Sequence, residues 1–406
     1  FHRGDVENAQ DVNYNDTTWE NINLPHDYSI DQEFTTSGEA ESGFLPGGVG
    51  WYRKSFVVPE KYKDKQLMVE FDGAYMNAEV YLNGKKLGDH PYGYTAFAFD
   101  LTDGLICDGK TENVLVVKTN NQIPSSRWYS GSGIYRDVTL TVTDDVHVGY
   151  NGTQIIAQDL EANKNGTVEV DITTTVENDS DTTKTVTVKN TLLDENGKVA
   201  SNTTTSQVEI AADSVQDIEQ SVNVEKPELW SVDDANMYKM KTEIVENDEV
   251  LDTYETDYGF RYYNFDKDTG FSLNGEKMKL KGVSMHHDQG SLGAVANRDA
   301  IERQVKILKE MGCNAIRVTH NPAASALLDI CNEYGMLVIN EAFDGWTEYK
   351  NGNVNDYTSH FEETITADNQ IINGEPGMQW GEFDTKAMVD GAKNDPSVIM
   401  WSIGNE

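Results

Sequence analysis

PSVIMWSIGNE, residues 396–406, is an apolar run that turns polar only at its end. The segment from Val398 to Ile403 is apolar on both faces apart from Ser402, which is typical of a buried parallel strand. Asn405 and Glu406 follow it side by side. In a (β/α)₈ barrel the chemistry lies at the carboxyl ends of such strands, so we predict a catalytic strand of that fold. A strand that leads into an ordinary polar loop is the alternative.

The sequence before this strand alternates between short apolar runs and amphipathic helices. The helix predicted at 299–311 has apolar residues at spacings near 3.6, with Asp299 as its N-cap and Gly312 as its C-cap. Polar residues follow every predicted strand. This pattern indicates a barrel or an open parallel sheet. The predicted strands are 277–283, 313–318, 336–339 and 398–403, and the other predicted helices are 322–335 and 383–392.

Composition excludes several classes of function. The formal net charge of −37 argues against nucleic acid or an anionic membrane as a partner, because both require a basic surface. No apolar run approaches the roughly 18 residues of a membrane span. Cys107, Cys313 and Cys331 stand far apart in apolar surroundings, so we expect buried small hydrophobes rather than disulfides or metal ligands. They do not fix the compartment: a bacterial cytoplasmic location and a secreted or cell-surface one both stay open, as does a homo-oligomer.

Two all-β regions precede the barrel-like segment. Residues 1–145 contain short alternating strands with turn signals such as Asn83-Gly84, which predicts a β-sandwich. Residues 146–264 are rich in Thr and Val, with turn clusters spaced as in an immunoglobulin-like sandwich. Trp128, Tyr129 and Tyr135 of the first region could stack on sugars, although core packing is the more common role. Judged by its irregular surroundings, Arg127 would be a solvated side chain.

Nine short motifs are distributed along the chain: LPHD (24–27), GWYR (50–53), GSGIYR (131–136), GFR (259–261), NG (274–275), GVSMHHDQG (282–290), RVTHNP (317–322), EAFDGW (341–346) and WSIGNE (401–406). With these motifs in this order, the chain resembles glycoside hydrolase family 2 over essentially its whole length, and it looks most like bacterial β-galactosidases. The resemblance implies a jelly-roll-like sugar-binding domain at 1–145, an immunoglobulin-like domain at 146–264, and the first half of a TIM barrel at 265–406.

The resemblance also implies roles for individual residues. Glu406 falls on the general acid/base, and Asn405 on the residue that contacts the sugar 2-hydroxyl. The subsite for the terminal sugar would be lined by His286, His287, Asp288, His320, Glu341 and Asp344, with Arg127 reaching in from the sandwich. Some members have aspartate at the position of Arg127. Trp401 or Trp346 could form an aromatic floor, with barrel core as the alternative for Trp401.

The expected chemistry is retaining hydrolysis of a terminal β-galactoside. Two carboxyl groups about 5 to 5.5 Å apart are needed, one as nucleophile and one as acid and then base. Glu406 could act as the acid only if its pKa is raised. No cofactor is expected to be required. Some members bind magnesium through a glutamate and a histidine after the third strand, but this chain has Asp344-Gly345-Trp346 there, so no metal ligand is predicted, although a bound cation is not excluded.

The predicted barrel is too short to be complete. From Phe271 to Glu406 the sequence offers four strands, whereas a barrel takes about 250 residues. In this family the nucleophilic glutamate follows the seventh strand, so we expect a fragment whose nucleophile lies beyond Glu406. Two alternatives to a β-galactosidase stay open: a β-glucuronidase or other exo-β-glycosidase of the family, and a non-catalytic carbohydrate-binding protein built on the same domains.

Overall fold

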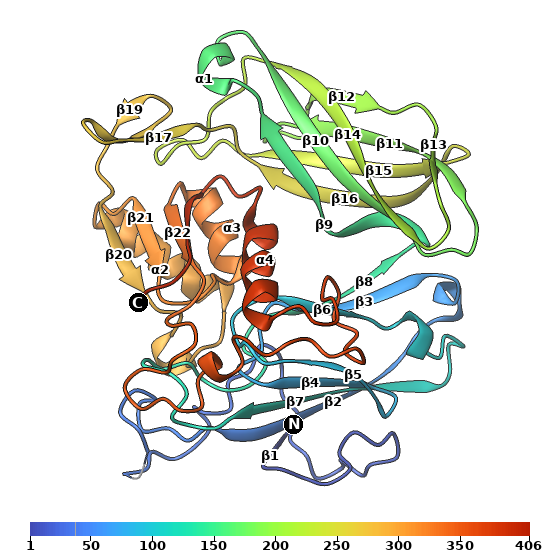
Figure 1. Ribbon diagram of the computed structural model, residues 1–406, viewed down its shortest axis with the longest axis vertical. Helices are drawn as coiled ribbons and strands as arrows, with labels where there is room; N and C mark the ends of the chain where they lie inside the picture. The colour runs from blue at the N-terminus through green and yellow to red at the C-terminus, as the bar shows by residue number, and fades with distance from the viewer. Residues whose placement is uncertain (37) are drawn as a thin grey trace.

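The computed structural model describes residues 1–36 and 38–406 of the chain. Figure 1 shows a β-sandwich at the bottom, a second β-sandwich at the upper right, and a set of parallel strands with their helices at the left, between the two. The three parts follow one another in the sequence, in the predicted order. The predicted architecture of a β-sandwich, an immunoglobulin-like sandwich and a partial barrel is therefore confirmed.

The first sandwich packs a five-stranded sheet against a three-stranded one. Inward residues alternate with outward ones, as in β3, where Leu67, Val69 and Phe71 are buried. Asn83 and Gly84 both have positive φ, as the predicted hairpin turn between β4 and β5 requires. In spatial order the sheets are β1 (His2–Arg3), β2 (Gly48–Val57), β7 (Glu112–Asn121), β4 (Ala78–Leu82) and β5 (Lys85–His90), and β6 (Phe97–Asp100), β3 (Gln66–Phe71) and β8 (Val138–Thr143), with 3₁₀ helices η1 (Glu60–Tyr62) and η2 (Thr102–Gly104) between strands.

The immunoglobulin-like domain is a second antiparallel sandwich. Alternate side chains of β10, including Val168, Val170 and Ile172, are buried between its sheets. In spatial order the sheets are β14 (Ser214–Glu225), β10 (Thr167–Asn178) and β9 (Val146–Ala157), and β12 (Val199–Thr204), β11 (Lys184–Leu193), β15 (Tyr238–Glu246) and β16 (Glu249–Tyr258), with β13 (Val208–Ile210) paired to β11 and the short helix α1 (Leu160–Asn163) before β10.

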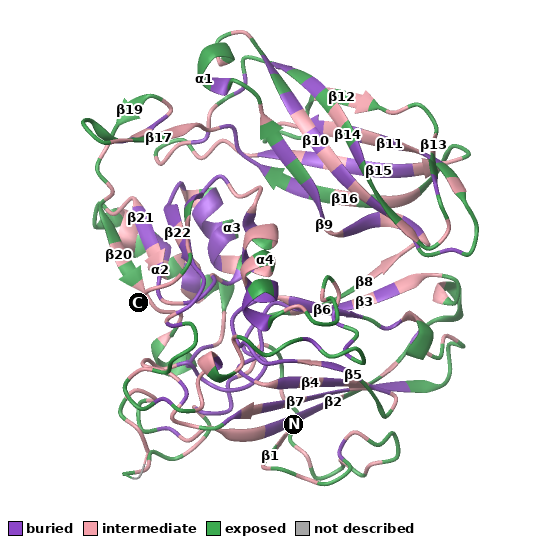
Figure 2. Ribbon diagram, in the orientation of Figure 1, coloured by how far each residue is buried: buried purple, intermediate pink, exposed green. Residues whose placement is uncertain are grey.

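The last part is a four-stranded parallel sheet with helices between its strands. Its strands lie in sequence order, β20-β21-β22-β23, as in one half of a barrel. Figure 2 shows buried residues along β22, in α3 and in part of α4. The elements are β20 (Gly282–Met285), η3 (Gly290–Leu292), α2 (Arg298–Glu310), β21 (Ala315–Val318), α3 (Ser325–Tyr334), β22 (Leu337–Glu341), η4 (Tyr357–Ser359), α4 (Trp380–Ala392) and β23 (Val398–Ser402), preceded by a small sheet of β17 (Tyr263–Asp266), β18 (Gly270–Leu273) and β19 (Glu276–Lys277).

Several element ends differ from the predictions. Asn297, not Asp299, is the N-cap of α2, and its side chain accepts a hydrogen bond from the Ala300 N–H at 3.0 Å. The helix ends at Glu310, and its C-cap is Met311 rather than Gly312. Helix α3 begins three residues after Pro322, and α4 begins at Trp380. The first barrel strand is also shorter than predicted, since it starts at Gly282.

The cysteine prediction holds fully for only one of the three residues. Cys331 is buried, whereas Cys107 and Cys313 are half-buried, and all three are free thiols. In the described residues, no helix is both long and apolar enough to cross a membrane.

Contacts from the sandwich domains fix the barrel strands. Arg261 of the immunoglobulin-like domain donates to the carbonyls of Pro396 and Val398, at 2.8 and 2.7 Å, and so holds the start of β23. Trp230 is fully buried and donates to the carbonyl of Asn332 at 2.8 Å. The strand that ends in Asn405 and Glu406 is therefore positioned by a neighbouring domain as well as by the parallel sheet.

Candidate active site

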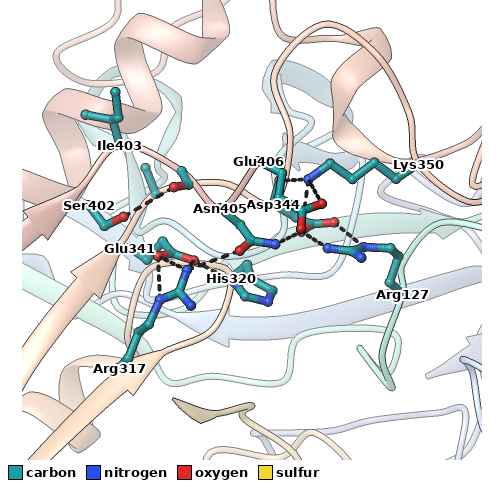
Figure 3. Close-up of polar contacts among 12 residues, drawn as sticks. Arg127, Arg317, His320, Glu341, Asp344, Lys350, Ser402, Ile403, Asn405 and Glu406 are labelled. Atoms are coloured by element: carbon teal, nitrogen blue, oxygen red, sulfur yellow. Dashed lines mark hydrogen bonds and ion pairs between the residues drawn. The ribbon is translucent and has the colours of Figure 1, made fainter.

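Glu341 is the buried centre of a polar cluster at the carboxyl ends of β21, β22 and β23. Arg317 of β21 donates to its two carboxylate oxygens, from Nε at 2.9 Å and from Nη2 at 3.0 Å. His320, which follows β21, donates from Nδ1 at 2.6 Å. Figure 3 shows these side chains converging on Glu341. Its side chain is fully buried, so both oxygens depend on these partners.

Asp344 is the second carboxylate of the cluster, and it joins the barrel to the first sandwich. Arg127, from the loop between β7 and β8, donates to both of its oxygens at 2.8 and 2.5 Å. Asn405 donates to it from Nδ2 at 3.0 Å. Burial raises the pKa of Asp344, but the hydrogen bonds from Arg127 and Asn405 outweigh it, so the pKa lies below its usual value. Arg127 is thus paired, not merely solvated.

Asn405 connects the two carboxylates. Its Oδ1 accepts from Arg317 Nη2 at 3.2 Å, and its Nδ2 donates to Asp344. Because one end of the amide meets a donor and the other a carboxylate, the orientation of the amide is defined. Its backbone N–H also donates to the carbonyl of Phe343 at 2.9 Å. The side chain and the backbone of Asn405 are therefore both fixed by hydrogen bonds.

Glu406 differs from the other two carboxylates because its side chain is mainly exposed. Its side chain is 68% exposed, against 0% for Glu341 and 18% for Asp344. Lys350 lies 3.5 Å from a carboxylate oxygen of both Glu406 and Asp344, as Figure 3 shows. Glu341 is therefore enclosed by its partners, and Lys350 links Asp344 to Glu406.

An aromatic wall lies beside the cluster. The Trp128 ring stacks on His286 at 4.8 Å between centroids and meets His320 edge-on at 5.7 Å. Burial lowers the pKa of His286, which favours the neutral ring. The cavity here has both polar and aromatic walls, as a sugar site requires. It is lined by Arg127, Trp128, His320 and Asp344, together with Tyr94, Phe343, Asn353, Asp356 and Tyr357 among others.

His287 and Asp288 lie apart from both the polar cluster and this cavity. His287 faces the sandwich, where its Nε2 donates to the carbonyl of Ser130 at 3.2 Å and its ring contacts Tyr94 and Tyr135. Burial, and then repulsion by Arg136, lowers the pKa of His287 to about 3, so the ring is neutral. Asp288 is exposed and does not line the cavity. The position of His287 therefore favours a packing role. The structure brings the other predicted residues together.

The sequence analysis assigned no role to Arg317 or Lys350. Arg317 had a usable signal, since a charged residue inside the apolar strand AIRV needs a buried partner. Lys350 lies in the long connection between β22 and α4, where no periodicity points to its neighbours. Of the aromatic candidates, Trp128 lines the cavity and Tyr135 is buried core. Trp401 packs between two core clusters, and Trp346 is 40% exposed over Gly404.

Outside this site, one group in the described residues has a spacing that a metal ion could use. His147, Glu177 and Asp179 lie on and just after β9 and β10, with ligand atoms within 4.8 Å of one another. The Nδ1 of His147 already donates to the carbonyl of Asp144 at 3.1 Å. None of the three lines the cavity of the candidate site.

Comparisons with known proteins agree with this architecture. Three family models match in order: "Glycosyl hydrolases family 2, sugar binding domain" at residues 9–144, "Glycosyl hydrolases family 2" at 153–261, and "Glycosyl hydrolases family 2, TIM barrel domain" at 266–406. The chain is 42% identical, over its whole length and 45% of the relative's, to the beta-galactosidase BoGH2A of Bacteroides ovatus. It is 36% identical, over 97% of its length and 35% of the relative's, to a putative beta-glucuronidase of Formosa agariphila.

A solved structure of a glycosyl hydrolase family 2 member from Bacteroides cellulosilyticus matches with a TM-score of 0.91 and 37% identity, over all of this chain and 50% of that one. The chain thus spans about half, or less, of the length of these relatives. Both sandwiches, the parallel strands and the motifs at their carboxyl ends are accounted for by one family. The chain belongs to glycoside hydrolase family 2.

Proposed function

We propose that this chain is part of a retaining exo-β-glycosidase that releases terminal β-galactose, with Glu406 as general acid/base and the nucleophilic carboxylate outside these residues. The observation that carries the proposal is the cluster at the ends of β21–β23, where Glu406 follows a held Asn405 and Lys350 lies between Glu406 and Asp344 of the cavity wall. A retaining mechanism needs one carboxyl group able to protonate the leaving oxygen and then deprotonate water. Glu406 is the carboxyl group that follows β23, and the family resemblance assigns the acid/base to this position.

The pairing of charges favours a neutral sugar over a uronic acid. Each cation in the described part of the site already faces a carboxylate: Arg127 pairs with Asp344, and Arg317 pairs with Glu341. Lys350 lies between Asp344 and Glu406. A glucuronide carboxylate would therefore have to displace one of these pairs, at a cost in desolvated charge. The relative from Bacteroides ovatus, named a beta-galactosidase, supports the same choice.

A β-glucuronidase is the second candidate, because several relatives carry that name, including two from Formosa agariphila. A non-catalytic carbohydrate-binding protein on the same domains is the third. The first test is a substrate panel. The full-length protein is expected to hydrolyse nitrophenyl β-galactoside faster than the matching glucuronide, and NMR of the first product should show β-galactose. Faster glucuronide hydrolysis would support the second candidate, no turnover with sugar binding would support the third, and an initial α-anomer would contradict retention.

We assign substrate contacts to the side chains around the cavity. Arg127, His286, His320 and Asp344 would bind the terminal sugar, and Asn405 would bind its 2-hydroxyl, an interaction that should strengthen in the transition state. Glu341 would act by holding Arg317 and His320. His287 and Asp288, which the family resemblance also places in the subsite, are the weakest members of this assignment, because His287 donates to Ser130 of the sandwich and Asp288 is exposed outside the cavity. We propose the domain bounds 1–145, 146–264 and 265–406, supported by the order of the sheets.

Arg127→Ala and His320→Ala are expected to weaken binding without removing a catalytic proton transfer. Each removes a hydrogen bond involving a charged group, worth roughly 1.5 to 3 kcal/mol, so kcat/KM should fall roughly 10- to 100-fold. Both limbs of the pH profile should remain. Arg303→Ala, at an exposed position on α2, is the matched control and should change little. Loss of one limb in His320→Ala would make His320 a titrating catalyst and overturn its assignment.

A further inference from the structure

Asp27, in the LPHD motif, is a buried carboxylate whose hydrogen-bond donors are all neutral. Asp27 is only 1% exposed. Oδ1 accepts from the N–H groups of Ser29 and Ser132, both at 2.9 Å. Oδ2 accepts from the Tyr129 hydroxyl at 2.6 Å and from the Ala294 N–H at 2.9 Å. Four donors around one buried carboxylate make a built arrangement, since an isolated buried charge would be costly.

These donors come from three separate parts of the chain. Ser29 belongs to the same N-terminal segment as Asp27. Tyr129 and Ser132 belong to the sandwich loop, residues 122–137, which connects β7 to β8. Ala294 belongs to the barrel connection between β20 and α2. Asp27 therefore ties the sandwich loop to the first strand-to-helix connection of the barrel.

Two glycines enclose the carboxylate. A Cβ placed on Gly131 would lie 2.5 Å from Asp27 Oδ2, and one on Gly293 would lie 2.3 Å from the same atom. Both glycines have positive φ, +69° and +64°. One belongs to the sandwich loop and the other to the barrel. The backbone therefore approaches Asp27 from both sides of the interface so closely that only glycine, which has no side chain, fits at these two positions.

The sandwich loop also carries Arg127 and Trp128, directly before Tyr129. Arg127 pairs with Asp344, and Trp128 stacks on His286. The far end of the loop has its own anchor, because the fully buried Arg136 donates to the carbonyls of Pro322 at 2.9 Å and Ala323 at 3.2 Å, just after His320. Before Arg127 the loop is held by the buried Ser125, which donates to Asn121 at 2.6 Å, and after Trp128 the first buried anchor is Asp27, through Tyr129.

We propose that Asp27 is a positioning residue, which holds the sandwich loop against the barrel so that Arg127 and Trp128 reach the sugar site. This inference rests on the proposed function, because it assumes that those two side chains contact substrate. Asp27 itself touches no substrate. Its carboxylate satisfies donors on both sides of the interface, and an amide in its place would turn an NH₂ group toward N–H or O–H donors. The loop would then shift, and a displacement near 1 Å at a positioning group can cost on the order of 100-fold in rate.

The test compares Asp27→Asn in two backgrounds of the full-length protein. Wild-type protein is first assayed on a panel of nitrophenyl glycosides, and its best substrate is used throughout. If the wild type prefers a substrate other than the galactoside, that result counts against the proposed function. The positioning role is tested separately, by comparing the loss of kcat/KM that Asp27→Asn causes in the two backgrounds. In the wild-type background, Asp27→Asn should lower kcat/KM roughly 10- to 100-fold, mostly through KM. In the Arg127→Ala background, the same change should cost several-fold less than in the wild type, because one of the two side chains it positions is gone and only Trp128 remains.

Two further variants keep the test decisive. Asn178→Ala removes a fully buried side chain of the immunoglobulin-like domain that donates to the carbonyls of Ile210 and Ala211, and should lower thermal stability without raising KM. Tyr129→Phe removes only one of the four donors, so it should fold and give a smaller rise in KM, with both limbs of the pH profile in place. Equal losses from Asp27→Asn in both backgrounds, or a matching KM rise in Asn178→Ala, would overturn the proposal.

Discussion

Glu406→Ala in the full-length protein is expected to lose far more activity on lactose than on dinitrophenyl β-galactoside. Lactose has a poor leaving group, so without an acid its hydrolysis should slow by the roughly 10²- to 10⁴-fold typical of general acid catalysis. A dinitrophenol leaves largely unaided, so formation of the galactosyl-enzyme should persist on the activated substrate. Glu406 follows β23 next to Asn405 and lies 3.5 Å from Lys350, at the edge of the sheet to which the acid is assigned.

Azide provides the stereochemical part of the same test. In Glu406→Ala the loss of a negative side chain leaves space for azide to attack the accumulated galactosyl-enzyme, and the product should be β-galactosyl azide. Glu310→Ala, at an exposed position at the end of α2, is the matched control and should behave as wild type with both substrates. If both substrates lost activity alike and the α-azide formed, Glu406 would be the nucleophile and the assignment here would be wrong.

The barrel strands could be predicted from sequence because their apolar runs are local signals. Val398 to Ser402 and Ala315 to Val318 both form strands within the predicted ranges. Element ends were less accurate, since the α2 cap depends on which side chain reaches the Ala300 N–H, and both Asn297 and Asp299 are good N-cap residues. The local sequence pattern therefore predicts that a helix or strand exists, but its exact ends depend on side-chain geometry in the folded chain.

The site could be predicted only in part. Carboxyl-end residues such as Glu341, Asp344 and Asn405 meet because parallel strands end at one edge, which the alternation of strands and helices implies. The pairing of Arg127 with Asp344 joins residues far apart in the sequence and depends on how the sandwich packs on the barrel. The orientation of the His287 side chain toward Ser130, away from the cavity, depends on the same packing. No local pattern encodes either contact.

Glu341→Gln is expected to be the most destabilising substitution in the site. The change keeps the size of the side chain but removes the charge that faces Arg317 and His320 in a fully buried position. Breaking a buried ion pair by removing one partner costs about 3 to 5 kcal/mol, because the other charge is left uncompensated. Arg317 is 35% exposed and regains some hydration, so we expect about 3 kcal/mol. Hydrogen exchange of peptides from β21 and β22 measures this loss of stability locally. A local measurement is needed because a chain of several domains does not unfold in one step.

A double variant separates the stability of Glu341 from its contribution to activity. Replacing both partners, Arg317→Met with Glu341→Leu, leaves no unpaired charge and should recover most of the lost protection. Activity should stay low, because Asn405 loses the Arg317 donor at 3.2 Å and His320 loses its carboxylate at 2.6 Å. Glu255→Gln, in an exposed pair with Lys239 at 2.9 Å, is the control and should cost about 0 to 1 kcal/mol. Recovery of activity together with protection would show that Glu341 is needed only for folding, and that His320 and Asn405 do not depend on it for their orientation.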